Sequence, residues 1–125
     1  MPVSKETIAG AIQALAAVPR VYMSPESLAE DAFLLSYALS QEEDYMAAVA
    51  NTCRALSQLE QKLVMVSDLK YQFATWQCYH YQHKVGQGRR ANMRIVFRYV
   101  EEGIQVRAFG HRNLPHDFYD LLANR

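Results

Sequence analysis

The chain has 125 residues, with 13 basic and 13 acidic side chains and a formal net charge of zero. Half of the residues are hydrophobic and 21% are charged, which is typical of one globular domain and unlike a disordered chain. The sequence has no apolar run near the roughly 20 residues of a membrane-spanning helix, no secretory signal pattern, and only two cysteines, which form no CxxC pair. We therefore expect a cytoplasmic protein without a membrane partner.

Three helices are predicted in the first half of the chain, over residues 4–18, 24–39 and about 40–63. Each begins with a recognisable signal: Ser4, then Ser24 followed by a proline, then a run of acidic residues at 42–44 that suits the positive end of a helix dipole. Residues 20–23 are predicted to be extended. The apolar stripe of the last helix comprises Tyr45, Val49, Thr52, Leu56, Leu59 and Leu63. We expect the last two helices to form an antiparallel hairpin, preceded by an N-terminal extension over residues 1–19.

The second half of the chain predicts strands. Residues 71–84 are rich in Tyr, Phe, Thr and Trp and lack Pro and Gly, which favours one long strand. Residues 86–92 contain two glycines and predict a loop. Residues 93–100 and 104–111 then alternate as the two strands of a hairpin around a Glu102-Gly103 turn. Residues 114–122 predict a short terminal helix or turn.

The register of this hairpin can be argued from its turn. A two-residue turn at Glu102-Gly103 sets Arg98 opposite Arg107 and Arg94 opposite His111. One face is then apolar, and the other carries these three arginines and the histidine. Like charges directly opposed are unfavourable, and a bound polyanion would relieve the repulsion. The alternative is that the arginines only solvate the outer face of the sheet.

The charge is distributed unevenly along the chain. Residues 1–69 contain four basic and nine acidic side chains, a net charge of −5, whereas residues 70–112 contain eight basic and two acidic ones, a net charge of +6. The overall neutrality therefore averages an acidic helical part with a basic part made of strands, and it does not exclude a nucleic-acid partner.

Two segments of the hairpin carry a resemblance to a known family. Met93-Arg94-Ile95-Val96-Phe97-Arg98-Tyr99-Val100, then Val106-Arg107-Ala108-Phe109-Gly110-His111-Arg112, and Tyr119 a few residues later, resemble the C-terminal half of RelE/ParE-type bacterial toxins. The order of strand, two helices, three strands and a terminal helix fits the same family over about residues 20–122. The resemblance implies an α+β fold in which a helix hairpin packs on a small antiparallel sheet. Residues 20–125 would form the toxin domain.

The resemblance also implies a function and a partner. Such proteins are the toxins of toxin–antitoxin pairs, so a cognate antitoxin is expected. One branch cuts mRNA, commonly on the ribosome, and another inhibits DNA gyrase. On the cleaving branch, Arg94, His111, Arg112 and Tyr119 occupy the positions of the family's catalytic residues. The alternative is a non-enzymatic member that acts by binding a protein, either as a DNA gyrase inhibitor or as a regulator.

The residue types suit metal-independent RNA cleavage. A base can take the proton of the 2′-hydroxyl, fixed cations can stabilise the phosphorus centre, and an acid can protonate the leaving oxygen. We expect His111 to be the acid–base group, Arg94 and Arg112 to hold the phosphate, and Tyr119 to donate a hydrogen bond or stack on a base. The expected contacts to the RNA backbone are His83, Lys84, Arg89, Arg90, Arg98 and Arg107. The histidine spacing predicts no metal site, and no cofactor is expected.

Overall fold

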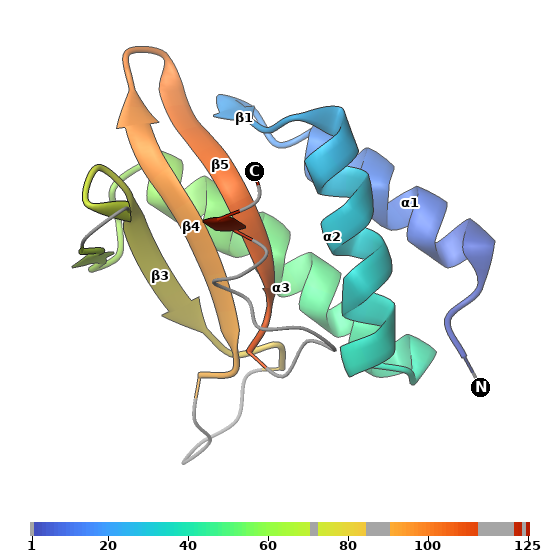
Figure 1. The fold of residues 1–125 in the computed structure, drawn as a ribbon. Helices are drawn as coiled ribbons and strands as arrows, with labels where there is room; N and C mark the ends of the chain where they lie inside the picture. Colours follow the sequence, from blue (N-terminus) through green and yellow to red (C-terminus); the bar gives the residue numbers. More distant parts are fainter. Residues whose placement is uncertain (1, 71–72, 85–90, 113–121, 124) are drawn as a thin grey trace.

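The computed structural model describes residues 2–70, 73–84, 91–112, 122–123 and 125. Three helices lie together on one face of a five-stranded sheet within these residues (Figure 1). The fold is therefore α+β, as predicted. The expected terminal helix over residues 114–122 lies outside the described residues except for Leu122, which is fully buried.

The helices form where their start signals predict them. Helix α1 is Lys5–Ala16, α2 is Pro25–Ala38 and α3 is Glu42–Glu60. The Ser4 hydroxyl accepts a hydrogen bond from the Thr7 backbone N–H, and Ser24 caps α2 in the same way. Leu63 is the exception: it lies beyond the end of α3 with 67% of its surface exposed, because the chain turns away after Glu60.

Helix α1 contacts α2 and α3 through apolar packing and through hydrogen bonds. Its Ala11 and Leu15 belong to the same hydrophobic core as α2 and α3. The hydroxyls of Ser4 and Thr7 both donate to the Glu42 carboxylate at the start of α3. These hydrogen bonds, with that of Thr7 the larger contribution, lower the pKa of Glu42. The N-terminal extension is therefore fixed against the entrance to α3.

The sheet has the strand order β1-β5-β4-β3-β2. These strands are β1 (Val21–Tyr22), β2 (Ser67–Asp68), β3 (Gln77–Tyr81), β4 (Met93–Val100) and β5 (Gly103–His111). Strand β1 runs parallel to β5 and the other neighbours are antiparallel, so the sheet is mixed and the expectation of a purely antiparallel sheet was wrong.

The predicted long strand over residues 71–84 is also wrong in extent. Of the described residues in this range, 73–84, only Gln77–Tyr81 pair as a strand. The backbone N–H of Trp76 donates to the Phe73 carbonyl at 2.9 Å, so the chain turns just before β3. Phe73 and Trp76 pack over Val96 and Ala108 on the face of the sheet away from the helices. Their aromatic side chains were counted as strand formers, whereas they cover the sheet from outside.

The β4–β5 hairpin has a different register from the one predicted. The two turn residues are Glu101 and Glu102, so Val100 pairs with Gly103 and Arg98 pairs with Gln105. A bulge then follows: Phe97 pairs with Val106 but Val96 pairs with Ala108, which leaves Arg107 as the extra residue. The predicted pairs of Arg98 with Arg107 and of Arg94 with His111 were therefore wrong.

Gly103 is required where the turn meets the edge strand. Its φ is 151°, and a Cβ atom built there would lie 1.9 Å from the Arg20 carbonyl oxygen. That carbonyl accepts a hydrogen bond from the Ile104 N–H at 3.0 Å, which brings the two backbones close together. Only glycine allows this approach without strain.

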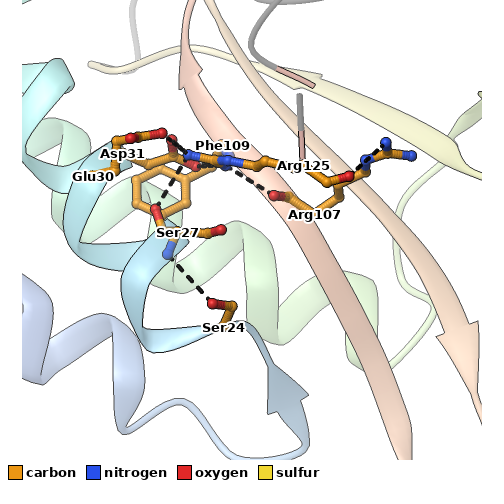
Figure 2. Close-up of polar contacts among 7 residues, drawn as sticks. All are labelled: Ser24, Ser27, Glu30, Asp31, Arg107, Phe109 and Arg125. Atoms are coloured by element: carbon orange, nitrogen blue, oxygen red, sulfur yellow. Dashed lines mark hydrogen bonds and ion pairs between the residues drawn. The ribbon is translucent and has the colours of Figure 1, made fainter. Parts of the chain in front are cut away.

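The edge of β5 is completed by a buried ionic cluster (Figure 2). Strand β1 covers this edge only at Ile104 and Gln105. Further along, Asp31 of α2 accepts from the Phe109 backbone N–H at 3.0 Å and from two nitrogens of the Arg125 guanidinium at 2.5 and 2.8 Å. Arg125 also donates to the Arg107 carbonyl oxygen at 2.9 Å. The Phe109 N–H and the Arg107 carbonyl, which β1 does not reach, are thus hydrogen-bonded to the charged side chains of Asp31 and Arg125.

We predict that Gly103→Ala lowers the free energy of unfolding by at least about 2 kcal/mol, because the new Cβ collides with Arg20 and the positive φ disfavours alanine. Urea unfolding followed by circular dichroism measures the change. Gly10→Ala is the matched control: nothing lies within 4 Å of its Cβ position in α1, so we expect a stabilisation of about 0.5–1 kcal/mol. Equal effects of both substitutions would contradict the requirement for glycine at position 103.

We predict that Arg125→Met lowers the free energy of unfolding by about 3–5 kcal/mol, because it leaves the Asp31 carboxylate buried without its cation. Asp31→Asn keeps an oxygen that can accept from Phe109 and removes the charge. The double variant should therefore recover part of the loss, as a double-mutant cycle of unfolding free energies would detect. Simple additivity of the two losses would show that the cluster does not act as a unit.

Candidate functional site

The face of the sheet away from the helices carries a set of basic side chains. Strand alternation places Arg94 and Arg98 of β4 on this outer face, since the core residues Ile95 and Phe97 between them face the helices. On β3, the residue directly opposite Arg94 is His80. Opposed residues of an antiparallel pair have Cα atoms about 4.5–5.5 Å apart, so their side chains share one local surface.

His111 lies on the other face, which corrects the predicted acid–base residue. It pairs with Met93, only 8% of it is exposed, and its ring centroid lies 6.5 Å from that of His83. The bulge at Arg107 causes this placement, because the extra residue reverses the alternation of every residue that follows. Arg94 and His111 are therefore separated by the sheet, and the predicted combination of the two is not assembled.

Burial is the main reason why the pKa of His111 is lowered, and the charges of His83 and Arg112 add to the effect. His83 itself is held by Asn92, whose side-chain oxygen accepts from the His83 backbone N–H at 2.9 Å and whose amide nitrogen lies 2.6 Å from the His83 Nδ1. His83 and His111 therefore pack against each other at the end of the β4–β5 ladder. His111 is too buried there to act as an exposed acid–base group.

His80 takes the position that His111 was expected to fill. It is exposed, and its Nε2 lies 3.6 Å from the Cys78 Sγ. Partial burial, followed by the charge of Arg94, lowers the pKa of His80, which favours the neutral form of the ring that can accept a proton. The Cys78 thiol is itself buried and its pKa is raised to about 11, which excludes a thiolate nucleophile near pH 7.

Arg112 continues the ladder beside Arg94. Its backbone N–H donates to the Asn92 carbonyl oxygen at 2.9 Å, its side chain is exposed, and its charge contributes to the lowered pKa of His111. Of the predicted catalytic residues, the outer face thus holds Arg94, which lies opposite His80. Arg98 lies on the same face, four residues further along β4.

Arg98 and Arg107 converge on one aromatic ring. Their guanidinium carbons lie 4.7 and 5.2 Å from the centroid of Trp76. Arg98 also donates to the Gln105 side chain at 2.7 Å, and Arg107 donates to the Leu122 and Arg125 carbonyls. Both were predicted to contact RNA, and both lie on the outer face, although they are not opposite one another.

The remaining predicted contacts are located differently. The Lys84 ammonium is exposed and lies 3.9 Å from the Glu43 carboxylate at the start of α3, and His83 lies beside His111 on the helix side. Arg89, Arg90 and Tyr119 lie outside the described residues. Among the described residues, no group of three or more His, Cys, Asp or Glu side chains could hold a metal ion, and no helix is long and apolar enough to cross a membrane.

No family model, no curated protein and no solved structure matches the chain. Its function must therefore be argued from the geometry of its own residues.

We predict that stability decreases as the pH falls below about 6.5, partly because of His111. A lowered pKa means that the unfolded chain binds the proton more readily, so the stabilising contribution is present above the ordinary histidine pKa and is lost as the pH falls through the folded pKa. Urea unfolding at several pH values should show a smaller loss for His111→Gln than for the wild type. The pKa of His80 is also lowered and contributes in the same direction, so the dependence of the unfolding free energy on pH should become weaker in His111→Gln without disappearing. An unchanged dependence would contradict the burial of a neutral His111.

Proposed function

We propose that the chain is a RelE/ParE-type toxin that acts in the cytoplasm as a metal-independent mRNA endoribonuclease, with its site on the outer face of the sheet. The observation that carries the proposal is the cross-strand pair of Arg94 and His80, with the exposed Arg112 directly after the end of β5. Cations that stabilise the phosphate and a histidine that accepts a proton are groups that cleavage of RNA by its own 2′-hydroxyl requires.

The reaction can be assigned to these side chains. The neutral ring of His80 takes the proton of the 2′-hydroxyl, and the 2′-oxygen attacks the adjacent phosphorus. The bond from phosphorus to the 5′-oxygen breaks, which gives a 2′,3′-cyclic phosphate and a 5′-hydroxyl. Arg94 and Arg112 stabilise the negative charge on the phosphoryl oxygens, since guanidinium groups stay charged and bind phosphate bidentately. Tyr119 is the candidate donor of the proton that the leaving oxygen needs; it lies outside the described residues.

The charge distribution supports a single binding face. The outer side chains of β4 include Arg94 and Arg98, whereas the three helices start with acidic residues: Glu6, Glu26 and the run Glu42–Asp44. RNA would approach the outer face, and its binding should weaken steeply with salt. A cognate antitoxin that neutralises the activity would cover the same face.

We predict that Arg94→Ala lowers the cleavage rate of a single-stranded RNA about 10²–10³-fold, because one phosphate-stabilising cation is lost. His80→Ala should lower it about 10²–10⁴-fold through loss of the base. The assay uses purified protein with EDTA present and identifies the termini of the products. Induction of the same variants in bacteria, scored for growth and mRNA integrity, gives the cellular counterpart.

Two control substitutions separate chemistry from folding. Arg54→Ala removes an exposed arginine from α3, on the helix side, and should leave the rate unchanged. His111→Gln should change stability more than the rate. Toxicity with intact mRNA, unaffected by His80→Ala, would reject the nuclease and favour the protein-binding alternative, for which DNA supercoiling is the direct measurement.

A further inference from the structure

A polar cavity of about 550 Å³ lies at the edge of the sheet, between the start of α2 and the middle of β5. This volume is within the range of ordinary ligand pockets. Ser24 and Ser27 lie on the α2 side and Arg107 lies across from them on β5 (Figure 2). The lining also includes an aromatic ring, an amide and a carboxylate, which belong to Trp76, Gln105 and Glu26.

Two arginines lie against the aromatic wall of this cavity. Arg98 and Arg107 lie over Trp76 at 4.7 and 5.2 Å, so two guanidinium groups share one indole ring. The ion pairs found among the described residues involve Arg20, Lys84 and Arg125, and none involves Arg98 or Arg107. Two like charges held near one ring repel each other, and an anionic ligand next to the ring would reduce that cost.

The polar groups of the cavity complement a heterocyclic base. The Gln105 side-chain oxygen accepts from Arg98 at 2.7 Å, which leaves its amide N–H groups able to donate. Glu26 is the acidic residue of the lining, and a carboxylate can only accept hydrogen bonds. A ligand with a flat ring, exocyclic amino groups and an attached phosphate would satisfy the indole, the carboxylate and the arginines together.

We infer that this cavity binds a base of the RNA strand next to the cleaved phosphate, and that Glu26 makes it prefer bases with an amino group over uracil. The inference rests on the proposed function for the identity of the strand. Arg94 and Arg98 are four residues apart on β4, or roughly 13 Å along the strand, so an RNA held at Arg94 reaches the cavity along one face. Adenine and cytosine present an exocyclic amino group, with two N–H donors, to a carboxylate, whereas uracil has no amino group and only its single ring N3–H as a donor.

Trp76 provides a direct measurement, because it is the single tryptophan of the chain. Short 2′-O-methyl RNA homopolymers of A, C and U cannot be cleaved at the blocked 2′-oxygen, so they report binding alone. Titration into the full-length protein should quench Trp76 fluorescence, with U roughly tenfold weaker than A or C. Anisotropy of the same oligonucleotides carrying a dye measures total binding independently.

The variants test each part of the inference. Glu26→Gln adds amide donors that can reach the carbonyl oxygens of uracil, so it should close the gap between U and the other two polymers. Glu6→Gln, an exposed acid on α1, is the matched control and should leave the gap unchanged. Trp76→Phe should abolish the fluorescence change and weaken binding by the loss of stacking area. Thermal melts establish that each variant is folded.

The outcomes separate this inference from the proposed nuclease. Saturated binding by anisotropy without a change in Trp76 fluorescence, or a preference that Glu26→Gln does not alter, would overturn the base-binding cavity even if RNA is cleaved. Quenching with the expected preference, in a protein that leaves ordinary RNA intact, would keep the cavity and reject the nuclease. Absence of binding to all three polymers would overturn both.

Discussion

The carboxylate of Asp31 is the contact on which the arrangement of the sheet depends. It is 1% exposed, yet it accepts from the Phe109 backbone and from Arg125, and thereby joins α2, β5 and the end of the chain at one point. Burial raises the pKa of Asp31, while the Arg125 guanidinium acts in the opposite direction. A buried charge of this kind is tolerated only when its hydrogen bonds are all made, so the cluster fixes one position of β5 against α2.

The bulge at Arg107 lies in the segment of β5 that Asp31 and Arg125 contact. Regular pairing of β5 with β4 would keep one alternation along the strand, and the bulge reverses it between Val106 and Ala108. Before the bulge, Val106 faces the helices; after it, Phe109 does. The Arg107 carbonyl accepts from Arg125 and the Phe109 N–H donates to Asp31. The ionic cluster thus stabilises the segment in which the strand changes faces, and it decides that His111 ends beside the core while His80 meets Arg94.

The sequence predicted the elements well and the register poorly, for physical reasons. Capping residues and apolar periodicity are local signals, and Ser4, Ser24 and the stripe of α3 located three helices. The bulge depends on Asp31 and Arg125, which lie 94 residues apart, and no local pattern encodes it. One signal was present: Asp31 lies between Leu28 and Leu35 on the buried face of α2, where a charge needs a partner. His80 also could have been found, because alternation from the core residues Tyr79 and Tyr81 places it on the outer face once β3 and β4 are paired.

Zero net charge has a structural meaning in this fold. Several acidic residues of the helical half are already paired: Glu60 with Arg20, Glu43 with Lys84, and Glu30 with Arg125. On the outer face, Arg98 and Arg107 contact an aromatic ring, a side-chain amide and backbone carbonyls, and the ion pairs among the described residues include neither arginine. The molecule is therefore neutral in total, but its sheet separates the arginines of the outer face from the acidic residues of the helices. Such a division weakens long-range attraction to a polyanion compared with a wholly basic protein, while it orients the bound strand on the one face where Arg94 and His80 meet.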